Sequence, residues 1–311
     1  MKKLLSLLLA LSLILLASCA KTQGNPEDGK LSVVVSFYPM YDFTLKVAGD
    51  LVNIKTLVPT GTEPHDWEPT AADIKAVSGA DLFIYSGVIE SWAGDLLRNR
   101  TEDSLTIMAA EGLPRLTSSG EFSGEFDRAT DLEHEADIDG HVWLTPKGAR
   151  GEAKKIKDVL ILADPANSEA YAANFESFAA ELDRLDRDYL AALAPHQGKT
   201  IVVSHESFGY LCAEYGINQL GIEGLSPDSE PLPSRMAEII DFVKDNHVTT
   251  IFFEELVSPR VAEAIASDTG AKPALLNPLE GLTEKQLDAG EDYLSIMRQN
   301  LEAIVASFEG E

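Results

Sequence analysis

The chain has 311 residues, of which 45% are hydrophobic and 24% are charged. This composition excludes an intrinsically disordered protein, and the length is sufficient for two domains of ordinary size. Lysine and arginine number 25 against 51 aspartate and glutamate residues, and the resulting net charge of -26 argues against nucleic acid as a partner. The same charge is compatible with the attraction of cations.

The first 18 residues have the pattern of an export signal. Two lysines precede the apolar run 4–17, which is too short to span a bilayer comfortably. The run ends in Leu16-Ala17-Ser18-Cys19, which has the pattern of a bacterial lipobox. We therefore predict that Cys19 is lipidated and anchors the protein to the extracytoplasmic face of the cell membrane, with residues 19–30 as a tether. The alternative is ordinary cleavage, which leaves an exported free thiol.

Short apolar runs alternate with helical patterns in residues 31–163. The predicted strands are 31–36, 52–58, 82–86 and 105–108, and the predicted helices are 41–48, 71–78, 89–98 and 147–162. This alternation predicts βαβ units and a parallel sheet. The pattern is lost in the acidic stretch 117–139, which contains His134. We predict a mobile surface loop there, with a cation-collecting loop as the alternative.

Residues 164–195 are predicted to form one long helix. Apolar residues recur there at spacings of three and four: Tyr171, Phe175, Phe178, Leu182, Leu185, Tyr189 and Ala192. Asp164 and Pro165 fit the N-terminus of a helix, and Pro195 ends it. At 1.5 Å per residue the helix would be about 39 Å long, which exceeds the width of a small domain. It is either an arm of a coiled coil or a strut between two lobes, and we favour the strut because βα patterns resume beyond it.

The second set of alternating elements occupies residues 196–311. Its predicted strands are 200–203, 219–222, 249–253 and 274–276, and its predicted helices are 208–215, 234–245, 259–268 and 288–308. The predicted fold is therefore α/β, with two lobes that each contain a mostly parallel sheet flanked by helices, joined by one rigid helix. Cys212 lies in a predicted apolar helix, where we expect a small buried side chain.

Three of the six histidines share a setting. His65, His141 and His205 each follow an apolar strand-like run or lie on a loop that proline or glycine restricts. Glu280 lies on the loop after the last predicted strand. Open α/β sheets bind ligands at the carboxyl ends of their strands, so these four side chains could converge between the lobes. Each histidine alone could equally be buried or stabilise a turn. The other histidines, His134, His196 and His247, lie in polar or acidic contexts.

Three imidazoles and one carboxylate suit a divalent transition metal. Imidazole favours zinc, copper or nickel, whereas manganese prefers carboxylate and carbonyl oxygen. Four such ligands at about 2.0–2.2 Å form a closed tetrahedral zinc shell. The ligand types leave copper and nickel possible. They also leave open whether Glu280 or a water molecule is the fourth ligand.

Five stretches carry a family resemblance. They are Pro64-His65-Asp66-Trp67-Glu68-Pro69, Gly140-His141-Val142-Trp143-Leu144, Ser204-His205-Glu206-Ser207-Phe208, Ser226-Pro227-Asp228-Ser229-Glu230-Pro231 and Asn277-Pro278-Leu279-Glu280-Gly281. With the lipobox and the long helix, they make the mature chain resemble the metal-specific solute-binding lipoproteins of bacterial ABC transporters, in particular the zinc branch of the zinc/manganese cluster.

The resemblance implies that His65, His141, His205 and Glu280 hold Zn²⁺ between the lobes, and that the protein delivers it to an ABC permease and its ATPase. Manganese members of this family have a carboxylate in place of His205 and an aspartate in place of Glu280, so both positions favour zinc. Manganese or another divalent metal is the alternative. Zinc members often carry a histidine-rich loop where this chain has an acidic one with only His134.

Other functional classes find less support in the sequence. A zinc hydrolase needs an open coordination position and a base, and Glu206 is the only candidate base. The stretch 205–209 lacks the second histidine of an HExxH helix, and the chain contains no GxSxG or P-loop pattern. We therefore predict a monomeric binding protein and not an enzyme. A lipid anchor also permits an adhesin role, which no sequence feature requires.

Overall fold

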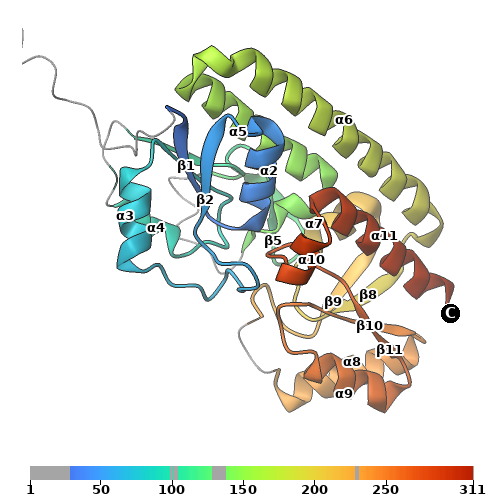
Figure 1. Ribbon diagram of the computed structural model, residues 1–311. Coiled ribbons are helices and arrows are strands. Elements are labelled where there is room, and N and C mark those ends of the chain that lie inside the picture. The colour runs from blue at the N-terminus through green and yellow to red at the C-terminus, as the bar shows by residue number, and fades with distance from the viewer. Residues whose placement is uncertain (1–28, 99, 101–103, 128–137, 228–230, 311) are drawn as a thin grey trace, which may run out of the picture.

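The computed structural model describes residues 29–98, 100, 104–127, 138–227 and 231–310. The predicted export signal, Cys19 and most of the tether lie outside these ranges, as do His134 and residues 228–230. Two sheets of parallel strands flanked by helices are present, and one long helix crosses both lobes (Figure 1). This arrangement confirms the predicted fold class. Within the described ranges, no helix combines the length and the apolar character needed to cross a membrane.

The first lobe is built on a four-stranded sheet in the order β2-β1-β3-β4, in which all neighbours are parallel. Its strands are β1 (Leu31–Val35), β2 (Val52–Thr56), β3 (Leu82–Tyr85) and β4 (Leu105–Met108). Its helices are α2 (Tyr38–Ala48), α3 (Ala71–Gly79), α4 (Ala93–Leu97) and α5 (Pro146–Ala163). All four residues of β3 are buried, as expected of a central parallel strand.

Two helices of this lobe begin elsewhere than the sequence pattern predicts. Helix α2 begins three residues before the predicted position 41, because Pro39 occupies its first turn, where proline is favoured. Helix α4 begins four residues after the predicted position 89. The delay has a local cause, since the Glu90 carboxylate binds the backbone N–H groups of Ser86 and Gly87 and closes a turn before the helix.

The second lobe repeats the plan with the strand order β11-β10-β8-β9, again all parallel. Its strands are β8 (Thr200–Val203), β9 (Asn218–Gly221), β10 (Thr250–Phe253) and β11 (Lys272–Leu275). Helices α7 (Gly209–Tyr215), α8 (Pro233–Asp245) and α9 (Arg260–Thr269) follow three of them. A small separate core, which includes Ile239, Ile251 and Ile265, joins α8 and α9 to the sheet. Cys212 is buried in α7, as predicted.

The predicted C-terminal helix 288–308 is present but begins five residues later than predicted, and a short helix that was not predicted precedes it. The structure has a short helix α10 (Glu284–Asp288) and a separate helix α11 (Tyr293–Glu309). Each begins with its own capping box, formed by Thr283 with Gln286 and by Asp292 with Ser295. A capping box satisfies backbone N–H groups that have no partner within the helix, so it fixes where each helix begins.

The acidic stretch 117–139 is more regular at its two ends than the sequence predicts. Strands β5 (Pro114–Thr117), β6 (Phe122–Glu125) and β7 (Ile138–Asp139) form an antiparallel sheet in the order β6-β5-β7. All of β6 is exposed, so it lacks the alternation of apolar and polar residues that indicates a strand. Residues 128–137 of the predicted mobile loop 117–139 lie outside the described ranges.

Helix α6 (Ser168–Leu193) is the long helix that was predicted at 164–195. It is shorter at both ends, where the chain forms 3₁₀ turns at Pro165–Asn167 and Ala194–His196. The predicted apolar stripe is buried as far as Tyr189, and Leu193 is buried instead of Ala192. The helix packs against α2 and α5 of the first lobe and against α11 of the second (Figure 1). The Tyr189 hydroxyl donates a 2.7 Å hydrogen bond to the Met297 carbonyl of α11. One apolar core therefore continues through both lobes.

Candidate metal centre

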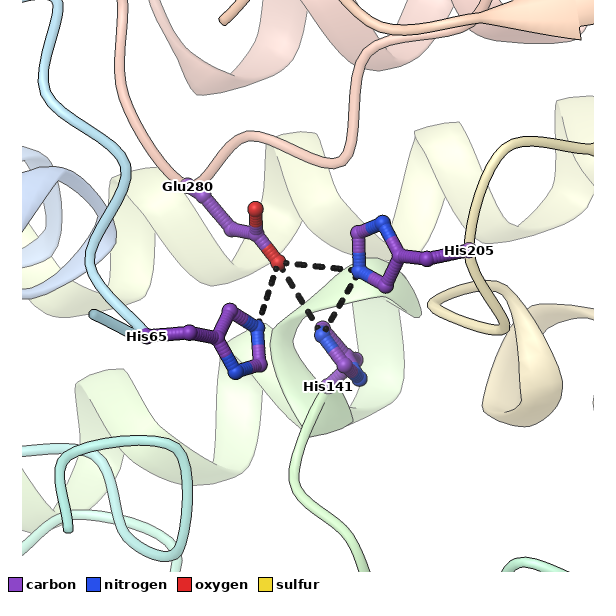
Figure 2. Close-up of side chains that lie close together, drawn as sticks. All are labelled: His65, His141, His205 and Glu280. Atoms are coloured by element: carbon purple, nitrogen blue, oxygen red, sulfur yellow. Dashed lines mark hydrogen bonds and ion pairs between the residues drawn. The ribbon is translucent and has the colours of Figure 1, made fainter. Parts of the chain in front are cut away.

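Four side chains that the sequence analysis selected meet between the lobes (Figure 2). His65 lies on the loop between β2 and α3, and His141 lies between β7 and the 3₁₀ turn Val142–Leu144. His205 follows β8, and Glu280 follows β11. One potential ligand atom from each lies within 4.8 Å of those of the other three. His196 and His247 are not part of this group, and His134 lies outside the described residues.

The donor atoms have the spacing that a single small ion requires. The Glu280 Oε1 atom lies 3.2 Å from His65 Nε2, 3.0 Å from His141 Nε2 and 3.3 Å from His205 Nε2. The Nε2 atoms of His141 and His205 are 3.3 Å apart. Zinc bonded tetrahedrally at about 2.0–2.1 Å places its ligands about 3.3 Å from one another. The observed spacing fits such a shell.

The cluster is shielded from solvent, but not equally on all sides. The side chains of His141, His205 and Glu280 are at most 2% exposed, whereas that of His65 is 10% exposed. An ion at the centre would therefore be largely buried, and His65 is the most exposed of the four side chains.

The backbone around His65 is fixed by its neighbours. The Glu63 carboxylate accepts hydrogen bonds from the backbone N–H groups of His65 (3.0 Å) and Asp66 (3.2 Å). On the other side, the Trp92 indole N–H donates a 3.1 Å hydrogen bond to the Pro64 carbonyl. Because proline also restricts φ at position 64, the loop has little freedom to turn the imidazole away from the centre.

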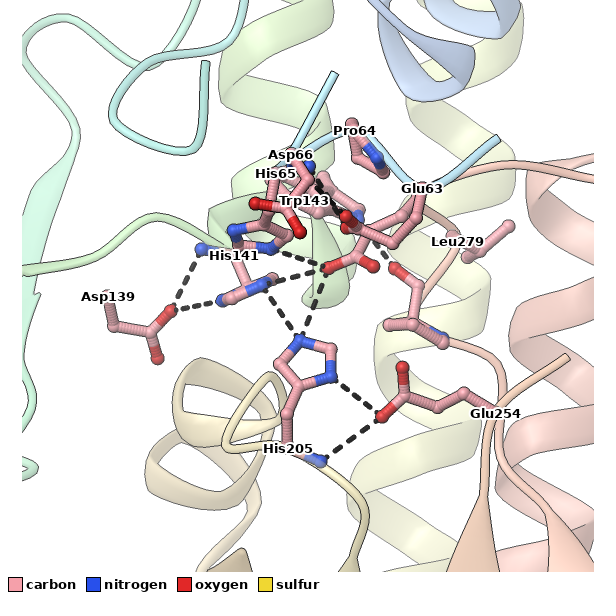
Figure 3. A network of polar contacts seen from close by, with 12 residues as sticks. Glu63, Pro64, His65, Asp66, Asp139, His141, Trp143, His205, Glu254 and Leu279 are labelled. Carbon is pink, nitrogen blue, oxygen red and sulfur yellow. Dashed lines mark hydrogen bonds and ion pairs between the residues drawn. The ribbon is translucent and has the colours of Figure 1, made fainter. Parts of the chain in front are cut away.

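Asp139 orients His141. One oxygen of its carboxylate lies 2.9 Å from both the backbone nitrogen and Nδ1 of His141 (Figure 3). An imidazole that donates from Nδ1 to a carboxylate presents the lone pair of Nε2 on its opposite edge. The Nε2 atom of His141 is the one that faces the cluster, so the observed partner selects the tautomer that a metal ion needs.

Glu254 does the same for His205 in the second lobe. Its Oε1 atom lies 2.7 Å from His205 Nδ1 and 3.2 Å from the backbone nitrogen of the same residue (Figure 3). Neither Asp139 nor Glu254 was predicted from the sequence to be a site residue. A signal for Glu254 was present, because it directly follows β10 and thus lies at the same edge of the sheet as His205 and Glu280.

The loop that carries Glu280 is bonded to the first lobe. The Trp143 indole N–H donates a 2.9 Å hydrogen bond to the Pro278 carbonyl, and the Tyr293 hydroxyl donates to the Trp143 carbonyl at 2.7 Å. Leu279 has a φ of 58°, a strained value for a leucine, and its N–H is held by the Asn277 side chain at 2.7 Å. These bonds fix the loop so that the carboxylate points at the three imidazoles.

Carboxylates control the protonation of the cluster. Burial alone would lower the pKa of His141, but the hydrogen bonds to Asp139 and Glu280 outweigh it and raise the pKa above its usual value. Burial is likewise outweighed at His205, where Glu254 and Glu280 raise the pKa well above its usual value. Burial would raise the pKa of Glu280, but the nearby imidazoles lower it well below its usual value. A metal ion that binds must displace the imidazole protons.

Comparison with known proteins places these observations in a family. Residues 33–307 match the family described as zinc-uptake complex component A, periplasmic. The chain is 38% identical to the high-affinity zinc uptake system protein ZnuA of Bacillus subtilis, over 95% of this chain and 94% of that protein. It is 36% identical to the zinc-binding protein AdcA of Streptococcus pyogenes, over 97% of this chain. It spans only 61% of that longer relative.

Solved structures show the same fold. The Zn(II)-bound ZnuA-like domain of Streptococcus pneumoniae AdcA aligns with a TM-score of 0.75 at 36% identity, covering 90% of this chain and 99% of that one. The laminin-binding protein of Streptococcus agalactiae, described as having adhesin and metal-transporting activity, aligns with a TM-score of 0.77 at 36% identity. That alignment covers 89% of this chain and 99% of the other.

The raised pKa of His205 can be measured directly. In the metal-free protein, we expect the His205 imidazole to lose its proton at a pH above about 6.5, the ordinary value for histidine. Substitution Glu254→Gln removes a facing negative charge and should lower this pKa, while His141, which bonds to Asp139, should change less. NMR titration of the histidine ring protons tests both. A His205 pKa at or below 6.5 in the unsubstituted protein would contradict the assignment.

Proposed function

Because the chain belongs to the family of zinc-uptake complex component A proteins, we propose that it captures Zn²⁺ between its lobes outside the cytoplasm and delivers the ion to an ABC permease and its ATPase. The observation that carries this proposal is the cluster of three imidazoles and one carboxylate: the Glu280 Oε1 atom lies 3.0–3.3 Å from all three Nε2 atoms, and the four ligand atoms lie within 4.8 Å of one another. The relatives named above for zinc binding and zinc uptake support it.

The proposed ligands are the Nε2 atoms of His65, His141 and His205 and the Oε1 atom of Glu280. Three nitrogen donors and one oxygen favour zinc over manganese, which prefers oxygen ligands in larger number. Asp139 and Glu254 lie outside this shell and hold two of the imidazoles in the ligating tautomer. Zinc is the cargo in this proposal, so the protein must release the ion as well as bind it.

Membrane attachment is also part of the proposal. The lipobox pattern at Cys19 would anchor the mature monomer beside the permease. A relative from Streptococcus pneumoniae, 38% identical over 98% of this chain, is described as the zinc-binding lipoprotein AdcA, which supports this assignment. A covalent lipid gives membrane attachment without a spanning helix.

We propose no catalytic role. A hydrolase needs a base near an open coordination position. Glu206 was the only candidate, and it is not one of the four residues whose ligand atoms converge. Its backbone N–H donates to the Gly224 carbonyl, and its carboxylate accepts a hydrogen bond from the Gly221 backbone. These contacts hold Glu206 toward the loop that follows β9.

The architecture favours small movements on metal binding. Helix α6 packs on both lobes, and the bond from Trp143 to Pro278 joins the loops of His141 and Glu280. A wide hinge closure needs a few residues between the lobes that can absorb large changes of φ and ψ. Here such a movement would break the contacts of α6 and the bond from Trp143 to Pro278. We therefore propose that zinc orders the ligand loops more than it moves whole lobes.

Metal competition tests the proposed ligands. The purified mature protein should bind one Zn²⁺ per chain in the presence of excess Mn²⁺. Loss of a residue that only orients a ligand lowers metal affinity by up to about 100-fold. Because His205 is a proposed ligand, the substitution His205→Ala should lower the zinc affinity by more than that. The control is His247→Ala, which removes an exposed histidine outside the cluster and should leave binding unchanged. Native mass spectrometry measures all three proteins, and equal zinc occupancy in the two variants would refute the assignment.

Small-angle X-ray scattering tests the proposed movement. Because α6 and the cross-lobe hydrogen bonds hold the lobes in place, zinc should leave the radius of gyration unchanged within the measurement error. Thermal unfolding of the same samples provides the control, because zinc should raise the melting temperature when it binds only the folded state. A melting temperature that rises together with a clear fall in the radius of gyration would contradict the rigid-lobe proposal.

A further inference from the structure

Two buried carboxyl groups of the first lobe do not belong to the group of four residues that converges between the lobes. Glu90 is on the loop between β3 and α4, and Glu152 is on α5. Both side chains are fully buried, and neither forms an ion pair with a basic side chain among the described residues. Burial without a cation is costly for a carboxylate. It raises the pKa of Glu90 to about 7 and that of Glu152 to about 8.

Glu90 uses both of its oxygens to close a loop. Its Oε1 atom accepts hydrogen bonds from the Ser86 backbone N–H (2.7 Å) and the Ser36 hydroxyl (2.6 Å). Its Oε2 atom accepts from the Gly87 backbone N–H at 2.8 Å. All three partners donate, and their hydrogen bonds oppose the effect of burial on the Glu90 pKa. Through Ser36 this turn is also joined to the end of β1.

The loop that Glu90 closes supports the backbone beside two proposed ligands. Ile89 packs so closely on Gly140 that a Cβ atom at position 140 would lie 2.6 Å from the Ile89 side chain. Gly140 immediately precedes His141. At the other end of the loop, the Trp92 indole N–H bonds to the Pro64 carbonyl, immediately before His65. Residues 86–92 therefore contact the chain next to both imidazoles that the first lobe contributes.

We propose that Glu90 is a positioning residue of the metal centre: its carboxylate fixes residues 86–92, and these residues fix the backbone that presents His65 and His141. This inference rests on the proposed function. This role gives a reason for an acidic side chain without a basic partner at a position where burial of an apolar side chain would destabilise the protein less. Glu90 acts through other residues and is not itself a ligand.

Glu152 provides a matched control. It is equally buried and also bonds to Ser86, whose hydroxyl donates to its Oε1 atom at 2.6 Å. Its Oε2 atom has no hydrogen-bond partner among the described residues. A glutamine at position 152 can therefore keep the one observed bond. A glutamine at position 90 cannot keep all three, because its NH₂ group must face a donor.

The test compares the variants Glu90→Gln and Glu152→Gln in full-length protein. Zinc affinity is measured by competition with a chelator, and the geometry of the site is measured from the visible absorption spectrum of the Co²⁺-loaded protein. We expect Glu90→Gln to lower zinc affinity by about tenfold or more and to alter the Co²⁺ spectrum. Glu152→Gln should match the unsubstituted protein in both measurements. A merely structural role would lower the melting temperature without changing the spectrum.

The outcomes separate this inference from the function on which it rests. If the unsubstituted protein binds neither Zn²⁺ nor Co²⁺, the proposed function fails. If it binds both and the two glutamine variants are indistinguishable in affinity and spectrum, only the role of Glu90 is overturned. Should Glu90→Gln not fold, Ser36→Ala removes one of its three donors and should accelerate zinc release several-fold. An unchanged release rate would then overturn the inference.

Discussion

The structure depends on one oxygen atom that three imidazoles share. The Oε1 atom of Glu280 lies 3.0–3.3 Å from the Nε2 atoms of His65, His141 and His205, and it is almost completely buried. A buried carboxylate without partners would be strongly destabilising, and so would the buried imidazoles of His141 and His205 if they lacked hydrogen-bond partners. Each group is tolerable because the others are present. This mutual dependence requires the loops that follow β2, β7, β8 and β11 to reach one point.

The fold meets that requirement with rigid elements. Parallel strands place the loops that follow β8 and β11 at one edge of their sheet, and α6 packs on helices of both lobes. Trp143 then bonds the His141 segment to the loop of Glu280, and Glu90 closes the loop that touches the chain beside His65 and His141. The cluster is thus held by hydrogen bonds from buried side chains to backbone atoms of the neighbouring loops.

The sequence predicted the parts of the fold in which the local pattern of apolar residues matches the faces that are buried in the structure. His65, His205 and Glu280 follow strand patterns, and the stripe of α6 has an unambiguous helical period. The errors arise where a distant or local side chain decides the structure. Glu90 delays α4, Asp292 begins α11 as a separate helix, and the exposed strand β6 forms by pairing with β5. Asp139 and Glu254 were missed because their roles depend on the orientation of an imidazole ring.

The central claim is that four protein side chains, three of them imidazoles, surround one zinc ion. X-ray absorption spectroscopy at the zinc edge of the loaded protein measures that shell most directly. The account predicts four nitrogen or oxygen ligands at about 2.0–2.2 Å, with the outer-shell scattering of three imidazole rings. A shell of six oxygen-like ligands, a zinc–sulfur distance of about 2.3 Å, or scattering from fewer than three imidazoles would contradict it.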